Sequence, residues 1–236
     1  MNEAFNELVL LSVMFVGSHF LMSHPPVRKF LIHRWREGPY RVVYGTVAVI
    51  LFVQLLLAFK ATPDVALPFV ALTLVPVYVM PLACILIFCG YTTGNPSALG
   101  LESLGKDKPV PGILKITRQP AMWGVGLFFL SHMAANPRVA EWIFFGALAV
   151  LALLGGFFLD QRKHDEGHAD WKALVAQSSF VPFVAVLSGK ARVTPGQIGW
   201  LRLLGGLVLF AVLLAAHEAV IGVAPLPPEL MLIIQG

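Results

Sequence analysis

Long apolar runs separated by short polar segments dominate the pattern along the chain. Six runs stand out, near residues 5–23, 41–59, 66–90, 119–135, 142–159 and 200–221. A helix needs about 20 residues to cross a hydrocarbon core about 30 Å thick, and the first, second, third and sixth runs are long enough. The fourth and fifth are shorter and are predicted to form a helical hairpin. Barrel strands would instead alternate over segments of about ten residues. The pattern therefore predicts an all-α, polytopic membrane bundle of about six helices.

The composition agrees with lipid as the solvent of this chain. Hydrophobic residues make up 57% of it and charged residues only 13%, whereas soluble domains average about 25% charged residues. The length of 236 residues fits a single membrane domain over 1–236. The first run is expected to be retained, because Glu3 and Glu7 replace the basic start of a secretory signal. Cys84 and Cys89 share one apolar run, so no disulfide framework is expected.

The basic residues predict how the bundle is oriented. With the N-terminus outside, the inner segments are 24–41, 91–118 and 160–202, and 15 of the 17 Lys and Arg residues fall on them. Lys60 and Arg138 remain outside. Such a bias is typical of segments on the cytoplasmic side, so both termini are predicted to lie outside. The net charge of +4 then reflects contact with anionic membrane lipid rather than a nucleic-acid partner.

Five of the seven histidines have ordinary explanations: His24, His33, His164, His168 and His217. His164 and His168 have a spacing that can hold a metal on one helical face. Zinc metalloproteases, however, carry Glu directly after the first His, and Gly167 weakens a helix here, so a solvated charged surface is favoured. His217, near the outer membrane edge, is expected to reach toward water.

His19 and His132 differ, because each lies inside an apolar run and follows a serine. Ionisable residues within a membrane are functional candidates by default. Two imidazoles on facing helices can hold a haem iron from both sides. Hydrogen-bonded histidines in a core explain the pattern equally well. The predicted topology sets the two histidines about 15–20 Å apart in depth at a rise of 1.5 Å per residue, which conflicts with one shared iron.

Arg118 is the third candidate, directly before the fourth run. A basic residue at this place can anchor a helix at the inner surface. Alternatively, its guanidinium can bind an acid such as a haem propionate or a cofactor carboxylate.

Three stretches carry a resemblance to a known family. They are GSHFLMSHPPVRKFLIHRWREGPYRVVYG (17–45), PGILKITRQPAMWGVGLFFLSHMAAN (111–136) and DQRKHDEGHADWKALVAQSSFVPFVAVLSGK (160–190). In order and spacing they resemble the opening helix, central motif and C-terminal loop of the NnrU family of bacterial inner-membrane proteins. NnrU is associated with denitrification, where it is linked to nitrite and nitric oxide reductase function. The family also includes the 15-cis-ζ-carotene isomerase, a membrane enzyme that depends on haem b.

The resemblance implies haem b as cofactor, with His19 and His132 at the positions implicated as axial ligands in the isomerase. It also implies a bundle cavity for an apolar or gaseous ligand. Two positions depart from the pattern: Gln119 replaces the histidine of an Arg-His-Pro motif, and Phe129 replaces a cysteine proposed as a switching ligand. Because a phenyl ring cannot coordinate iron, haem binding is expected here rather than ζ-carotene isomerase activity. If the chain is an enzyme, redox-gated cis–trans isomerisation of a polyene is the reaction implied.

Two other functions stay open. Residues 118–120 and 164–182 are also similar to isoprenylcysteine carboxyl methyltransferases, whose C-terminal region binds S-adenosylmethionine, although Gln119 departs from that pattern too. The other alternative is a non-catalytic accessory protein of a nitrogen-oxide reductase or of a haem or pigment pathway. The sequence indicates no oligomeric state.

Overall fold

The computed structural model describes residues 3–96, 109–226 and 230, and these residues are helical with irregular connections. The helices are α1 (Glu3–Ser23), α2 (Pro25–Trp35), α3 (Glu37–Ala61), α4 (Leu74–Thr92), α5 (Gly112–Ile116), α6 (Pro120–Ala135), α7 (Val139–Glu166), α8 (Ala169–Ala176), α9 (Val184–Leu187), α10 (Pro195–Ile198) and α11 (Trp200–Ile221). Within the described residues, β pairing is limited to an isolated bridge between Ala66 and Arg138. The predicted all-α class is confirmed.

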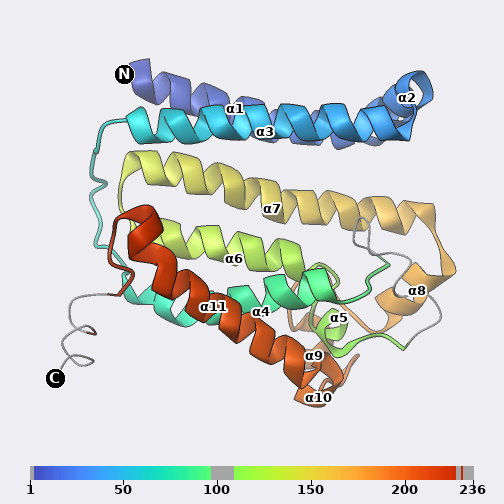
Figure 1. Cartoon of the computed structure of the whole chain (residues 1–236). Coiled ribbons are helices and arrows are strands. Elements are labelled where there is room, and N and C mark those ends of the chain that lie inside the picture. Colours follow the sequence, from blue (N-terminus) through green and yellow to red (C-terminus); the bar gives the residue numbers. More distant parts are fainter. Residues whose placement is uncertain (1–2, 97–108, 227–229, 231–236) are drawn as a thin grey trace.

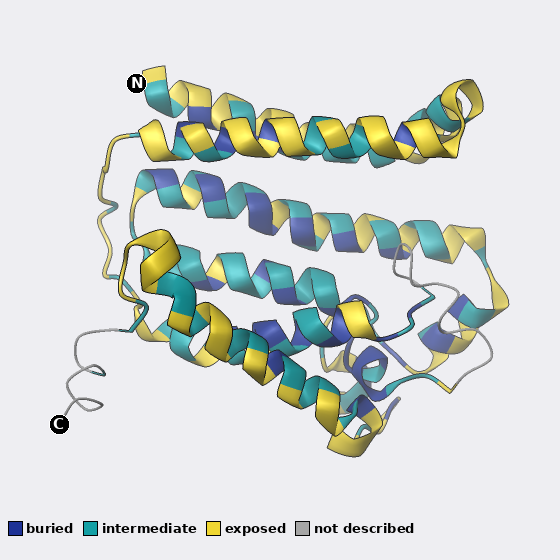
Figure 2. Cartoon of the chain, in the orientation of Figure 1, coloured by how far each residue is buried: buried dark blue, intermediate teal, exposed yellow. Residues whose placement is uncertain are grey.

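The outer surface of the bundle is apolar. Five helices, α1, α3, α4, α7 and α11, are long and apolar enough to cross a membrane, and α6 is shorter. Large apolar side chains point away from the protein, among them Leu57, Leu201 and Val220, which are 61%, 84% and 76% exposed. Figure 2 shows such exposure along the outer faces of α3 and α11. Because a soluble monomer rarely exposes so much contiguous apolar surface, the chain is a polytopic membrane protein.

The long helices lie in successive layers (Figure 1). The antiparallel pair α1 and α3 packs against α7, α7 packs against α6, and α4 lies between α6 and α11. The short elements α2, α5, α8, α9 and α10 gather at one end, which we call the basic end because most of the predicted inner Lys and Arg residues lie there. Lys106 and Lys108 fall outside the described residues. Which end faces the cytoplasm stays a prediction.

Helix bounds follow the predicted runs except in two places. The third run, predicted from residue 66, becomes helical only at Leu74. Residues 62–73 form an irregular connection, because Pro63 and Pro68 interrupt the helix. Within it, the Leu67 amide donates to the carbonyl of Pro137 at 2.7 Å. The fifth run, predicted to end at 159, continues through charged residues to Glu166. Its helix ends at Gly167, whose φ of +65° is the left-handed conformation of a helix C-terminus.

Glycines let α4 approach both of its neighbours closely. A Cβ atom at Gly124 of α6 would lie 2.7 Å from the carbonyl oxygen of Ala83, and one at Gly206 of α11 would lie 2.5 Å from the Cα of Ile85. Small residues permit such backbone contact between membrane helices. Cys84 and Cys89 are free and buried in this helix, as expected from their apolar run.

Candidate functional site

A cavity of about 400 Å³ lies among α3, α4, α6, α7 and α11. Its volume is within the range of about 300–1,000 Å³ found for ligand and cofactor sites. Its wall is mainly aromatic and aliphatic and includes six phenylalanines: Phe52, Phe128, Phe129, Phe144, Phe145 and Phe210. Among the described residues that line it, His132 and His217 alone have polar side chains. The cavity therefore offers an apolar ligand space with two imidazoles.

His132 lies on the last turn of α6, where its ring orientation is fixed. The ring stacks on Phe128 with centroids 4.4 Å apart, and its Nδ1 lies 2.8 Å from the Phe128 carbonyl oxygen. Because a carbonyl oxygen only accepts, Nδ1 carries the hydrogen, and Nε2 of the neutral ring keeps a lone pair. This arrangement is typical of histidines that bind a metal through Nε2.

Phe129 occupies the position at which the resemblance to the isomerase implies a cysteine. Its side chain lines the same cavity as His132. This position therefore offers a phenyl ring where the resemblance implies a cysteine.

His19 lies in a different environment, on the face of α1 that meets α3. Its Nδ1 donates to the carbonyl of Phe15 at 2.7 Å, and its ring contacts Tyr44 edge-on with centroids 5.5 Å apart. The orientation of the imidazole thus resembles that of His132. His19 is absent from the described lining of the cavity.

Contacts with α7 show how far apart in depth His19 and His132, the two predicted iron ligands, lie. Phe20, next to His19, contacts Phe158 with ring centroids 5.5 Å apart, and His132 contacts Phe145 at 5.5 Å. These two α7 positions are thirteen residues apart, or about 20 Å along the helix axis. The separation agrees with the depth difference expected from the topology. Two ligands of one iron would have to lie much closer together than this arrangement brings them.

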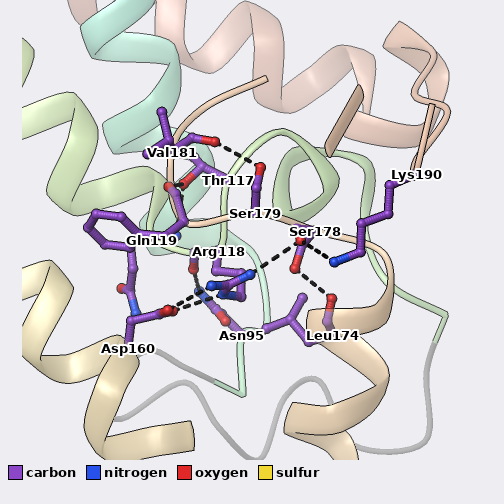
Figure 3. Close-up of polar contacts among 11 residues, drawn as sticks. Asn95, Thr117, Arg118, Gln119, Asp160, Leu174, Ser178, Ser179, Val181 and Lys190 are labelled. Atoms are coloured by element: carbon purple, nitrogen blue, oxygen red, sulfur yellow. Dashed lines mark hydrogen bonds and ion pairs between the residues drawn. The ribbon is translucent and has the colours of Figure 1, made fainter. Parts of the chain in front are cut away.

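Arg118 faces a carboxylate of the protein itself at the basic end (Figure 3). Its Nε and Nη2 donate to the two oxygens of Asp160 at 2.9 and 2.7 Å, and its Nη1 donates to the Ser178 carbonyl at 3.2 Å. The guanidinium also lies 5.4 Å from the ring centre of Trp171. From Pro120 to His132 the helix α6 rises about 18 Å, so Arg118 and His132 lie far apart. That Arg118 binds a cofactor acid stays a prediction.

Further hydrogen bonds around Arg118 form a polar cluster that holds several segments together (Figure 3). Asn95 donates to the Arg118 carbonyl at 2.9 Å, and the Thr117 hydroxyl donates to the carbonyl of Phe180. Gln119 is 3% exposed, and its Nε2 has no hydrogen-bond partner in the part of the chain that the structure describes. The cluster connects the start of α6 to α7, to the segment after α4 and to the loop after α8.

The remaining histidines are placed as the sequence predicts, with one exception. The side chains of His164 and His168 are 71% and 73% exposed, and Gly167 ends α7 between them, so that His168 lies outside that helix, directly before α8. No cluster of three or more His, Cys, Asp or Glu residues able to hold a metal ion occurs within the described residues. His217 is the exception, because it lines the cavity instead of only reaching toward water.

Fold and site together define a polytopic helical membrane protein with a histidine-bearing aromatic cavity. The family model described as NnrU protein matches residues 7–225. The chain therefore belongs to the NnrU family, and the resemblance noted in the sequence is confirmed over nearly its whole length. No curated protein and no solved structure matches the chain.

Proposed function

We propose that this NnrU-family protein binds haem b inside its membrane domain, with His132 as an axial ligand. The observation that carries the proposal is the position of His132. Its ring is oriented by the Phe128 carbonyl, with the Nε2 lone pair available, on the wall of a cavity with mainly aromatic and aliphatic lining. The porphyrin ring of haem b suits such a lining, whereas its two propionates need polar surroundings. Imidazole is a common axial ligand of haem iron.

The donor set favours haem over a bare metal ion. A bare transition metal such as zinc takes about four protein ligands or three with a water, and no such group occurs among the described residues. A porphyrin itself supplies four nitrogens, so one or two imidazoles complete the coordination of its iron. The chain's part is to bind the macrocycle, orient the imidazole and exclude water from the iron.

Membership of the NnrU family supports a role in nitrogen-oxide metabolism. Bound haem would supply a redox-active iron, and the apolar cavity suits a small uncharged ligand such as nitric oxide. Redox-gated isomerisation of a polyene is the less favoured activity, because Phe129 puts a phenyl ring on the cavity wall at the position of the cysteine proposed as a switching ligand in the isomerase.

Absorption spectra test the proposal. The detergent-purified protein, produced with ample haem, is measured oxidised and dithionite-reduced beside His132→Ala and His164→Ala, an exposed control position at the end of α7. We expect an intense haem Soret band in the wild type and the control, and an altered or missing one in His132→Ala. A colourless wild type would overturn the proposal, and S-adenosylmethionine binding would then be measured.

A further inference from the structure

A second imidazole, His217 of α11, shares the cavity with His132 of α6. The two helices run in the same direction and end at the same side of the bundle (Figure 1). His132 lies three residues before the end of α6 at Ala135, and His217 lies four residues before the end of α11 at Ile221. The two histidines therefore lie at similar depth, whereas His19 is near the end of a helix that runs the opposite way.

The end of α11 fixes the His217 ring. Gly222 has a φ of +85°, a left-handed conformation that glycine adopts readily, and it turns the chain back over the last helical turn. The Val223 carbonyl oxygen then lies 2.8 Å from Nδ1 of His217. Since the carbonyl only accepts, Nδ1 donates, and Nε2 of the neutral ring keeps its lone pair. His217 thus has the same hydrogen-bonding pattern as His132.

The packing of α11 also accounts for the space between these histidines. The first half of the helix lies directly on α4, where Gly205 and Gly206 leave no room for a Cβ atom. Its second half carries larger residues, including Phe210 and Leu214, and these line the cavity instead.

We infer that His132 and His217 together form the axial ligand pair of the haem, one imidazole from α6 and one from α11. This inference rests on the proposed function. Polar groups are costly to keep in an apolar interior unless they are used, and bis-imidazole ligation uses both. His19 then has a structural role, joining α1 to α3 through its contact with Tyr44.

Spectroscopy of four variants tests the inference: His217→Ala, His217→Met, His19→Ala and His164→Ala as control. We expect the sharp α and β bands of six-coordinate, low-spin haem in the wild type, in His19→Ala and in the control. His217→Ala should shift to a high-spin, five-coordinate spectrum, and added imidazole should restore the low-spin form. His217→Met keeps an axial ligand, and its reduction potential should rise, as it does when methionine replaces histidine as a haem ligand.

The outcomes separate the inference from the proposed function. A colourless wild type refutes haem binding itself. A coloured wild type whose spectrum and potential persist in both His217 variants overturns the ligand assignment and leaves haem binding intact. Loss of the low-spin bands in His19→Ala also overturns it. A His217→Ala protein that melts at the wild-type temperature but retains no haem supports the assignment, as does the rise in potential in His217→Met.

Discussion

Replacing Asp160 with leucine removes the carboxylate that neutralises Arg118 at the basic end. The side chains of Arg118 and Asp160 are only 13% and 7% exposed, so the guanidinium would be left in an environment that water barely reaches. Breaking a buried ion pair by removing one partner costs about 3–5 kcal/mol. For a chain of this size each kcal/mol lowers the melting temperature by about 2–4 °C. The expected loss for Asp160→Leu is therefore roughly 6–20 °C.

The reciprocal change, Arg118→Met, should cost a similar amount. It leaves the Asp160 carboxylate buried and also removes the contact of the guanidinium with Trp171. The Ser178 carbonyl that Arg118 binds does not lose every donor, since Nζ of Lys190 also donates to it at 3.2 Å. Loss of that carbonyl contact therefore adds little to the cost.

Combining the two substitutions tests the pairing itself. Replacing a whole buried ion pair with apolar residues of similar volume is often neutral or stabilising. The double variant, with Arg118→Met and Asp160→Leu, should therefore melt above either single variant. Contacting residues typically show coupling energies of about 0.5–3 kcal/mol. If the two losses simply add in the double variant, the reasoning is refuted.

Two native cysteines allow the thermal unfolding of these variants to be followed by thiol labelling. Cys84 and Cys89 are both free and 0% exposed on α4, so a thiol-reactive fluorogenic dye labels them only as the bundle opens on heating. The matched control is Arg41→Met, which breaks the exposed pair of Arg41 and Glu37, whose side chains are 73% and 51% exposed. Exposed pairs contribute little, so this variant should melt with the wild type.

Three further predictions follow from packing, burial and topology. Gly124→Ala forces a Cβ atom to within 2.7 Å of an α4 backbone oxygen, so it should cost about 1–3 kcal/mol in the same melting assay, whereas Gly17→Ala, with open space around it, should not destabilise. Gln119→Leu removes an amide nitrogen buried without a partner among the described residues, so it should raise stability by up to about 3 kcal/mol, and a lower melting temperature would contradict this. If the basic end is cytoplasmic, an impermeant maleimide should label Asp64→Cys in intact cells but not His164→Cys, and the reverse labelling would invert the topology.

Hydropathy predicts the helices well because lipid offers no hydrogen-bond partners to the backbone. Every peptide group in the hydrocarbon must be satisfied within its own segment, so an apolar run of sufficient length becomes a helix, and α11 begins and ends where its run does. The pattern fails at residues 66–73, which are apolar but not helical. Apolar composition alone does not distinguish an irregular segment from a helix, and Pro63 and Pro68 are the available signal.

The partner of Arg118 could not be predicted from the chain. Asp160 lies 42 residues away, at the point where the predicted fifth helix gives way to charged residues. A local pattern places each residue at the basic end but does not pair them, because pairing depends on how α6 packs against α7. The sequence therefore leaves both anchoring and acid binding open for Arg118.

The sequence predicts His217 at the membrane edge, because position along a helix indicates depth but not which way a side chain faces. In a soluble protein, the apolar face of an amphipathic helix would have marked the interior. In α11 the faces toward lipid and toward the bundle are both apolar, so that signal vanishes.

The remaining signal was the topology itself. The alternating directions of the helices place His19 and His132 at different depths in the membrane. The same directions place His132 and His217 at one depth. Pairing candidates by equal depth, rather than by resemblance of motif, selects the two histidines that line one cavity.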